Sequence, residues 1–589
     1  MKNIQAKVLH IMWTVVPWFI FPCAAFYLME TFHHNPFANI NPNAQVLNII
    51  TFIAIAILLW VLTGSRKWAF RIESVIALGI GLGDYYVIRF RGTPILPWDV
   101  YSLKTALSVS GDYSYALEKE AVFSILGFVL LVVLAGLGKD YRLNKKYWQV
   151  RLAGGFLAMG VLVGEYQLLK QPEFILDMRI YDKLFTPYTM IKRDGIAVAF
   201  MLELQYMEVE KPAGYSAKEA SEAYEALSDD IIVSEAEEKR PNVIVVMNEA
   251  FSDPAVLGDF ETNEDYMPVL HSLQEGAENT ITGLMNVSVV GGNTANTEFE
   301  FLTGSSMAFL PDGSVPYQQY IDDDTDSMAS YLRDMGYKTI AMHPYNAGGW
   351  ERDTTYPYLG FDTFYSLKNF SRVKKVREYV SDDSCVDRII KEFEASKEPC
   401  FIFNVTMQNH SPYTAAYENF TPDITVEGSD SFQLSTYLSL MKVSDASLGR
   451  LLEYFSQVEE DTVIVFFGDH QPTDSVVRDV WRLNGVDPDN LTEEQQCLRY
   501  QVPFVVWANY DIEEQTDVMT SANFLGAQVF EWCGISKSGY QNYLLDLTEE
   551  YSAITARTVM DDEKNFIEID KVRDKLLEYN MLQYYRLFG

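Results

Sequence analysis

The chain has 589 residues, a formal net charge of −35 and a hydrophobic content of 48%. This length predicts two or three folding units rather than one small domain. The strong negative charge argues against nucleic acid as a partner. Charge and hydrophobicity are unevenly distributed, because residues 1–170 are apolar and net positive while the remainder is strongly acidic. We therefore expect a membrane domain, residues 1–170, joined to a soluble acidic part.

Five apolar runs are candidates for transmembrane helices, since about 20 apolar residues cross a bilayer as a helix. They are residues 11–30, 46–64, 72–90, 121–138 and 152–168. The third run is the weakest, because it contains Glu73 and Asp84. Acidic side chains within a span normally face other helices rather than lipid. We predict a five-helix transmembrane bundle; the alternative for any single run is a buried core helix.

Basic residues set the expected orientation of this bundle, since positively charged loops stay cytoplasmic. They precede the first run, separate the second from the third, and separate the fourth from the fifth. Five spans place the N terminus inside and the acidic part outside, whereas four spans would leave the acidic part in the cytoplasm. The first run lacks an obvious small-residue cleavage site, which favours an anchor over a removed signal peptide. We expect a multi-pass protein of the cell membrane with an extracellular acidic domain.

Residues 171–240 are predicted to be a linker with amphipathic helices, which either lie at the membrane surface or pack on the soluble domain. The five cysteines show no metal-ligand spacing. Four of them lie beyond residue 240, where one or two disulfides could form.

From Pro241 onward, short β-rich runs alternate with helical patterns. The runs are residues 242–247, 337–342, 400–407, 462–467 and 502–507. This alternation predicts an α/β domain over residues 241–589, with a central, mostly parallel sheet covered by helices on both faces. Ligands of such sheets bind beyond the carboxyl ends of the strands.

Ionisable residues directly follow four of these runs. They are Glu249, His343, His410, and the pair Asp469 and His470. Because the carboxyl ends of parallel strands share one edge, we expect these side chains to meet there. Carboxylate and imidazole ligands suit Mn²⁺, Zn²⁺ or Mg²⁺. A single such histidine is usually structural, but three of the seven histidines lie at these strand ends.

The loop 291–304, GGNTANTEFEFLTG, adds hydroxyl groups and then continues as an apolar, strand-like run. Taken alone, it is typical of a turn whose Ser or Thr residues cap the following helix. Beside a divalent ion, a threonine could instead bind the metal as alkoxide and attack phosphorus or sulfur, because the ion lowers the pKa of a bound hydroxyl. One of the threonines of this loop could fill that role.

Five ordered motifs resemble those of the lipoteichoic acid synthase and phosphoglycerol transferase family, a membrane-anchored branch of the sulfatase and alkaline phosphatase superfamily. They are NVIVVMNEAF (242–251), GGNTANTEFEFLTG (291–304), AMHPYNAGGWERD (341–353), TMQNHSPY (406–413) and FFGDHQP (466–472). The resemblance implies an extracellular sulfatase-like domain that acts in cell wall biogenesis. The implied donor is phosphatidylglycerol, and the implied acceptor is a glycolipid or a growing polyglycerolphosphate chain. The implied cofactor is one divalent ion, with Mn²⁺ favoured over Mg²⁺ and Zn²⁺.

The resemblance also implies roles for individual residues. The family's metal ligands match Glu249, Thr294, Asp469 and His470, and Thr294 is also the nucleophile that forms a threonine-linked intermediate. Thr297 is a rival nucleophile. The positions that hold glycerophosphate match His343, Trp350, Arg352 and His410, and His410 or His343 would move a proton. Further candidates around them are Asn248, Asn293, Asn296, Glu298 and Asn409. Relatives carry a lysine where this chain has Asn293, a departure that bears on the donor and acceptor rather than on the metal.

Other functions are compatible with parts of this pattern. The donor could be phosphatidylethanolamine, or the acceptor a periplasmic glucan. A catalytically inactive envelope scaffold is a different class, although such a protein should have lost a metal ligand or the nucleophile. A two-zinc phosphatase would need more Asp and His ligands, and a formylglycine sulfatase would need a cysteine in the loop 291–304.

Overall fold

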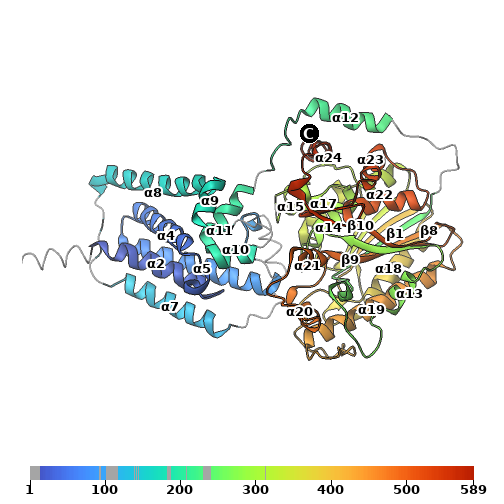
Figure 1. Cartoon of the computed structure of the whole chain (residues 1–589), viewed down its shortest axis with the longest axis horizontal. Helices are drawn as coiled ribbons and strands as arrows, with labels where there is room; N and C mark the ends of the chain where they lie inside the picture. Colours follow the sequence, from blue (N-terminus) through green and yellow to red (C-terminus); the bar gives the residue numbers. More distant parts are fainter. Residues whose placement is uncertain are drawn as a thin grey trace, which may run out of the picture. The chain divides into compact units, whose positions relative to one another are not determined.

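The computed structural model describes residues 14–91, 94–100, 117–137, 140, 142, 145–181, 187–206, 209–229, 240–311 and 313–589. These residues form two compact units, one up to Tyr206 and one from Val209 onward (Figure 1). Parts of the predicted runs 11–30 and 121–138, and of the linker 171–240, lie outside the described residues.

The first unit is helical. Its helices are α2 (Pro17–Glu30), α3 (Pro36–Asn39), α4 (Pro42–Thr63), α5 (Arg66–Arg91), α7 (Lys119–Ala135), α8 (Trp148–Leu169), α9 (Pro172–Met178), α10 (Pro187–Asp194) and α11 (Ile196–Glu203). Helix α4 packs against α2, α5 and α8, and α5 packs against α2 and α7. Each of the five predicted spans therefore corresponds to a helix of this unit.

The ends of α4 show why the chain is helical only over this range. The side chain of Asn41 caps its first turn by accepting from the Asn43 N–H, and Pro42 occupies the position where a missing N–H costs nothing. Gly64 ends the helix in the left-handed conformation, with φ of 67°. Between these residues α4 is almost entirely apolar.

Helices α4 and α8 are long and apolar enough to cross a membrane. In α5, Glu73 and Asp84 are buried, whereas Val75 and Ile80 are exposed on the unit's surface. The acids therefore face other helices, as expected for a span. The arrangement of five spans with an outer acidic domain stays a prediction.

The second unit is built on an eight-stranded mixed sheet in the order β10-β2-β9-β8-β1-β7-β3-β4 (Figure 1). Its strands are β1 (Asn242–Asn248), β2 (Thr280–Asn286), β3 (Lys338–His343), β4 (Thr363–Ser366), β7 (Cys400–Val405), β8 (Thr462–Gly468), β9 (Gln501–Ala508) and β10 (Gln515–Ser521). Strands β8, β1, β7, β3 and β4 are mutually parallel. Strand β9 runs antiparallel to both β2 and β8, so the predicted run 502–507 is a strand of the opposite direction.

Helices cover both faces of this sheet. The helices of this unit are α12 (Ala217–Asp229), α13 (Pro268–Gln274), α14 (Thr294–Thr303), α15 (Pro316–Gln319), α16 (Met328–Asp334), α17 (Arg352–Tyr358), α18 (Asp382–Ala395), α19 (Phe432–Phe455), α20 (Asp474–Leu483), α21 (Glu493–Leu498), α22 (Ala522–Trp532), α23 (Gly539–Thr548) and α24 (Leu577–Phe588), of which α12 packs on α23 and α24. Alternate residues of β1 enter two separate cores, Val245 with α14 and α22, and Ile244 with α18 and α19. The smaller strands are β5 (Lys375–Val376), β6 (Tyr379–Val380), β11 (Tyr551–Ile554), β12 (Thr558–Asp561) and β13 (Phe566–Glu568).

Two expectations from the sequence are wrong. The run after the loop at 291–293 is not strand-like, because residues 294–303 form α14, and every side chain of this helix is buried. This helix packs against the rest of the unit all around its axis, so its sequence lacks the apolar stripe on one face that is typical of a surface helix. The possible disulfides are absent as well, since all five cysteines are free.

A pH-dependent contact lies at α13, where His271 joins two carboxylates. Its Nδ1 is 2.8 Å from Asp265 Oδ1 and its Nε2 is 3.4 Å from Asp253 Oδ2. Hydrogen bonding to Asp253, followed by that to Asp265, raises the pKa of His271 to about 9. Because the folded-state pKa lies above the ordinary value of about 6.5, the stabilisation is complete below pH 6.5 and is lost as the pH rises through 9.

We therefore expect His271→Asn to lower the free energy of unfolding at pH 6 by about 1 kcal/mol, a modest figure because the side chain is partly exposed. At pH 9.5 the variant and the wild type should unfold alike. Thermal unfolding at the two pH values measures the difference. An equal loss at both values would show that packing, not charge, carries the contact.

Candidate functional site

Four parallel strands end at the same edge of the sheet and deliver the predicted residues there. Strand β1 lies between β8 and β7, and β3 follows β7. The loops that carry Glu249, His343, His410 and Asp469 therefore start side by side. Gly468, at the end of β8, is required for this, because a Cβ there would lie 1.8 Å from the Phe251 carbonyl oxygen.

Glu249, Asp469 and His470 form a compact cluster of ligand atoms. One atom from each residue lies within 4.8 Å of the others, and all three side chains are buried. The Nε2 atom of His470 is 3.3 Å from Asp469 Oδ2 and 3.8 Å from Glu249 Oε1. Among the described residues, no other group of three His, Cys, Asp or Glu side chains has this spacing.

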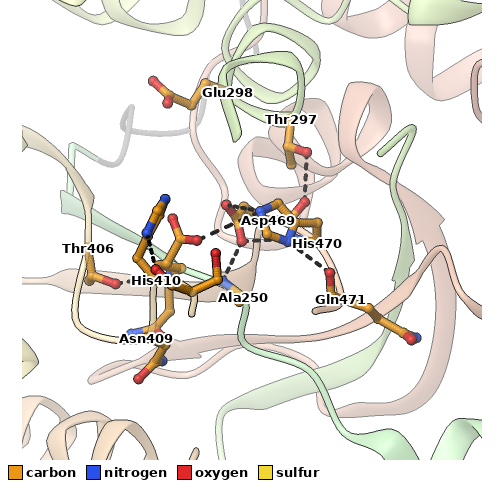
Figure 2. A network of polar contacts seen from close by, with 12 residues as sticks. Ala250, Thr297, Glu298, Thr406, Asn409, His410, Asp469, His470 and Gln471 are labelled. Atoms are coloured by element: carbon orange, nitrogen blue, oxygen red, sulfur yellow. Dashed lines mark hydrogen bonds and ion pairs between the residues drawn. The ribbon is translucent and has the colours of Figure 1, made fainter. Parts of the chain in front are cut away.

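Backbone hydrogen bonds orient Asp469 and His470 and leave one side-chain atom of each without a hydrogen-bond partner. Asp469 Oδ1 accepts from the N–H groups of Ala250, at 2.7 Å, and His470, at 2.9 Å (Figure 2). His470 Nδ1 lies 2.9 Å from the Gln471 carbonyl and must donate to it, because a carbonyl only accepts. Asp469 Oδ2 and His470 Nε2 are buried without a hydrogen-bond partner. Two carboxylates and an imidazole lone pair that are desolvated together fit a divalent cation.

The electrostatics of Glu249 agree with this interpretation. Burial and the neighbouring Asp469 raise the pKa of Glu249 well above its ordinary value, whereas Arg352 and Arg377 oppose the rise. Two buried carboxylates this close repel each other unless a cation lies between them. A divalent ion would remove this repulsion.

Thr294 is the first residue of α14, and both sides of it are tied to the cluster. Three residues before it, the Gly291 N–H donates to the Gln471 carbonyl at 2.8 Å. Three residues after it, the Thr297 hydroxyl donates to the Asp469 carbonyl at 2.8 Å. Asn293 turns the chain into the helix with φ of 63°, and its side chain makes no cap. Thr297 is fully buried and its hydroxyl is already hydrogen-bonded, whereas Thr294 retains 7% exposure.

His343 and His410 are both held through Nδ1. The Nδ1 of His343 is 3.1 Å from the Val405 carbonyl, and that of His410 is 2.8 Å from the Ser411 carbonyl. Each Nδ1 therefore carries a proton, because a carbonyl only accepts. Burial, followed by the charge of Arg352, lowers the pKa of His343 well below its ordinary value, so this ring is neutral.

Arg352 lies buried against a carboxylate. Its Nε is 3.0 Å from Glu298 Oε1, its Nη2 also pairs with Glu298, and the Tyr356 hydroxyl donates to Glu298 Oε2 at 2.6 Å. Its Nη1 makes only a long hydrogen bond, 3.4 Å to the Gly349 carbonyl. Trp350, two residues before Arg352, is half-buried and, like Glu351, adopts a left-handed backbone conformation.

Behind the cluster lies a polar network that the sequence did not reveal in full. Asn248 donates to Asp382 Oδ2 at 2.8 Å, and Asn409 donates to Asn248 at 2.9 Å and to Ser444 at 2.9 Å. Burial raises the pKa of Asp382 to about 6. In the sequence, Asp382 is an ordinary first-turn acid of α18, so nothing there singles it out. The other predicted amide, Asn296, points elsewhere and donates to the Ser314 carbonyl at 2.9 Å.

Comparison with known proteins identifies the family of the second unit. Residues 241–535 match the family model described as Sulfatase. The chain belongs to the sulfatase family. It is 30% identical over 490 residues to a Rhizobium meliloti protein named for the modification of cyclic beta-1,2-glucan, and the match covers 80% of this chain and 74% of that protein.

Further relatives of this sulfatase-family chain include lipoteichoic acid synthase 1 of Bacillus subtilis, which is 21% identical over 429 residues, covering 69% of this chain and 64% of the relative. The resemblance to lipoteichoic acid synthases is thereby confirmed. A Streptococcus pyogenes phosphoglycerol transferase in complex with sn-glycerol-1-phosphate superposes with a TM-score of 0.52 at 24% identity, covering 64% of this chain and 94% of that one.

The integral membrane phosphoethanolamine transferase A of Neisseria meningitidis has the same TM-score of 0.52 at 13% identity, covering 90% of this chain and 97% of its own. That likeness shows a shared fold which extends beyond the sulfatase domain into the helical unit.

Proposed function

We propose that the chain is a metal-dependent phosphoglycerol transferase of the cell membrane. It would move glycerol phosphate from phosphatidylglycerol to a glycolipid or a growing polyglycerolphosphate chain. The observation that carries the proposal is the buried cluster of ligand atoms on Glu249, Asp469 and His470. It lies beside the start of α14, whose flanking residues Gly291 and Thr297 are hydrogen-bonded to the segment 469–471. Support also comes from the relatives named lipoteichoic acid synthase.

In this proposal Glu249, Asp469, His470 and Thr294 hold one divalent ion, with Mn²⁺ favoured. When bound, such an ion lowers the pKa of a hydroxyl and offsets charge on phosphoryl oxygens. The Thr294 oxygen attacks phosphorus, the bond from phosphorus to the diacylglycerol oxygen breaks, and diacylglycerol leaves after gaining a proton. A hydroxyl of the acceptor then attacks the glycerophosphoryl-threonine, releasing Thr294.

The surrounding residues would position the substrate and move protons. Helix α14 begins at Thr294, and its first N–H groups suit phosphoryl oxygens. The Nε2 of His343 accepts a hydrogen bond from a glycerol hydroxyl, since its Nδ1 already donates. His410 exchanges the proton of the leaving and attacking hydroxyls. Arg352 donates a hydrogen bond to the glycerophosphate through Nη1, and the Trp350 ring packs against the glycerol.

A second candidate has a glucan as acceptor. It is favoured by one observation, the relative named for cyclic beta-1,2-glucan modification, which matches over 80% of this chain. The same nucleophile and metal ligands would serve both acceptors. A phosphoethanolamine donor is a further alternative, consistent with the fold shared with a phosphoethanolamine transferase.

Donor and acceptor assays with the full-length protein in nanodiscs test the proposal. With Mn²⁺, we expect diacylglycerol to be released from phosphatidylglycerol, to stop when EDTA is added, and to resume when Mn²⁺ is restored. Headgroup-labelled donor offered with glycolipid, polyglycerolphosphate or cyclic glucan identifies the acceptor. Release from phosphatidylethanolamine alone would overturn the donor assignment, and Mn²⁺ binding without release from either lipid would favour the scaffold.

A further inference from the structure

The hairpin β5–β6 lies outside the central sheet and contributes a buried arginine. Its two strands pair Lys375 with Val380 and Val376 with Tyr379. Arg377 occupies the turn with φ of 55°, a conformation that favours glycine. Turn residues are usually exposed, yet Arg377 is 4% exposed. An unfavourable backbone and an inward side chain together indicate that the guanidinium group itself is needed here.

The guanidinium of Arg377 binds the loop that carries His410. Its Nη1 donates to the Pro412 carbonyl at 2.9 Å, and its Nη2 donates to the Gln408 carbonyl at 2.8 Å and the His410 carbonyl at 2.7 Å. These carbonyls belong to an irregular segment, so no strand neighbour satisfies them. The planar guanidinium group can donate to three carbonyls at once. A lysine ammonium group fits this arrangement of acceptors less well.

Tyr379 from the same hairpin contacts the ring of His410. Its hydroxyl lies 3.2 Å from His410 Nδ1, and the two rings meet edge to face with centroids 5.5 Å apart. Since Nδ1 also donates to the Ser411 carbonyl at 2.8 Å, the ring is fixed from two sides. The hairpin therefore determines both the backbone and the ring orientation of His410.

The neighbours of the Arg377 charge include the rings of Tyr379 and Tyr413, whose centroids each lie 5.5 Å from the guanidinium carbon. In the part of the chain that the structure describes, no carboxylate forms an ion pair with it, and its Nε has no hydrogen-bond partner. Arg352, the other buried arginine near the metal ligands, is neutralised by Glu298. A buried charge without a counter-charge is unfavourable unless an anion completes it. The guanidinium of Arg377 lies against the His410 loop, so an anion that completes the charge would bind beside that loop.

We propose that Arg377 and Tyr379 are positioning residues of the transferase site. Arg377 holds the His410 loop and brings to it a positive charge that an anionic phosphoryl group can complete, and Tyr379 orients the His410 ring. This inference rests on the proposed function. Its chemistry requires only an anionic phosphate ester with a hydroxyl to be protonated or deprotonated.

The test uses the full-length protein loaded with Mn²⁺, glycerol phosphate as binding probe, and steady-state transfer. Arg377→Gln should weaken glycerol phosphate binding by roughly 10-fold and lower kcat by about 100-fold, since displacement of a proton-transfer group by about 1 Å has that effect. Arg377→Lys restores the charge and should recover binding but not kcat. Tyr379→Phe should lower kcat by about 10-fold with KM unchanged.

Matched controls come from Arg388 and Tyr365, an arginine stacked on a tyrosine whose hydrogen bonds go to Asn369 and Glu392 instead. Arg388→Gln and Tyr365→Phe should leave binding and kcat within about 2-fold of wild type. The inference is overturned if Arg377→Gln behaves like Arg388→Gln. If Arg377→Gln does not fold, Tyr379→Phe decides, and equality with Tyr365→Phe overturns it.

Thr294→Ala, assayed in parallel, separates the two proposals. Full turnover in that variant removes the proposed function, while the binding measurements on Arg377 still stand. Loss of turnover in Thr294→Ala together with unchanged Arg377 variants removes only the present inference.

Discussion

Thr294→Ala is expected to abolish diacylglycerol release, with a loss of at least about 10³-fold in kcat, because the variant has no oxygen to form the bond to phosphorus. Structure should be little affected, since the change removes only a hydroxyl and a methyl group from the first residue of α14. Steady-state release from phosphatidylglycerol, with thermal unfolding as a check on folding, measures the effect.

Two variants of the same helix sharpen this result. Thr303→Ala removes a hydroxyl that donates to the Phe299 carbonyl at the far end of α14, and it should keep turnover near wild type. Thr297→Val removes the hydroxyl bound to the Asp469 carbonyl. Transfer that survives Thr294→Ala but disappears in Thr297→Val would move the nucleophile three residues along the helix.

Glu298→Leu should have the largest effect on stability. The pair Glu298 and Arg352 is almost fully buried, with side-chain exposures of 0% and 2%. Removing the carboxylate leaves the guanidinium desolvated and unpaired, which should lower the free energy of unfolding by about 3–5 kcal/mol. Chemical or thermal denaturation of the purified protein measures it.

The double variant Glu298→Leu with Arg352→Met is the matched control. It removes both charges while roughly keeping volume, and it should regain much of the lost stability. If Arg352 contributes to transfer as proposed, this stable double variant still has low activity. A double variant as unstable as Glu298→Leu alone would show that packing around Tyr356, rather than charge, is responsible.

The sheet was predictable from the sequence because its signal is local. The apolar runs at 242–247, 400–407 and 462–467 contain strands β1, β7 and β8, and the parallel pairing of these strands brings the residues that follow them to one edge. Glu249, Asp469 and His470 could therefore be grouped before any coordinates. The reversed direction of β9 could not be predicted, since a strand buried on both faces has the same sequence pattern in either direction.

What the sequence could not show is pairing between distant side chains. Glu298 and Arg352 were separate candidates, and only the fold shows that one neutralises the other. Arg377 sits in a two-residue turn whose sequence signals exposure, so its burial was hidden. Helix α14 was missed because its Phe and Glu residues are buried on all sides, which erases the helical periodicity on which such predictions depend.

The bond from the Ala250 N–H to Asp469 joins residues 219 positions apart in the chain. Closing a loop of that length has a substantial entropic cost that must be met before the contact forms. The three ligand atoms therefore converge only where β8 lies beside β1. A metal ion that binds this centre recognises the finished domain and not its precursors, so it shifts the equilibrium toward the native state instead of guiding the chain to it.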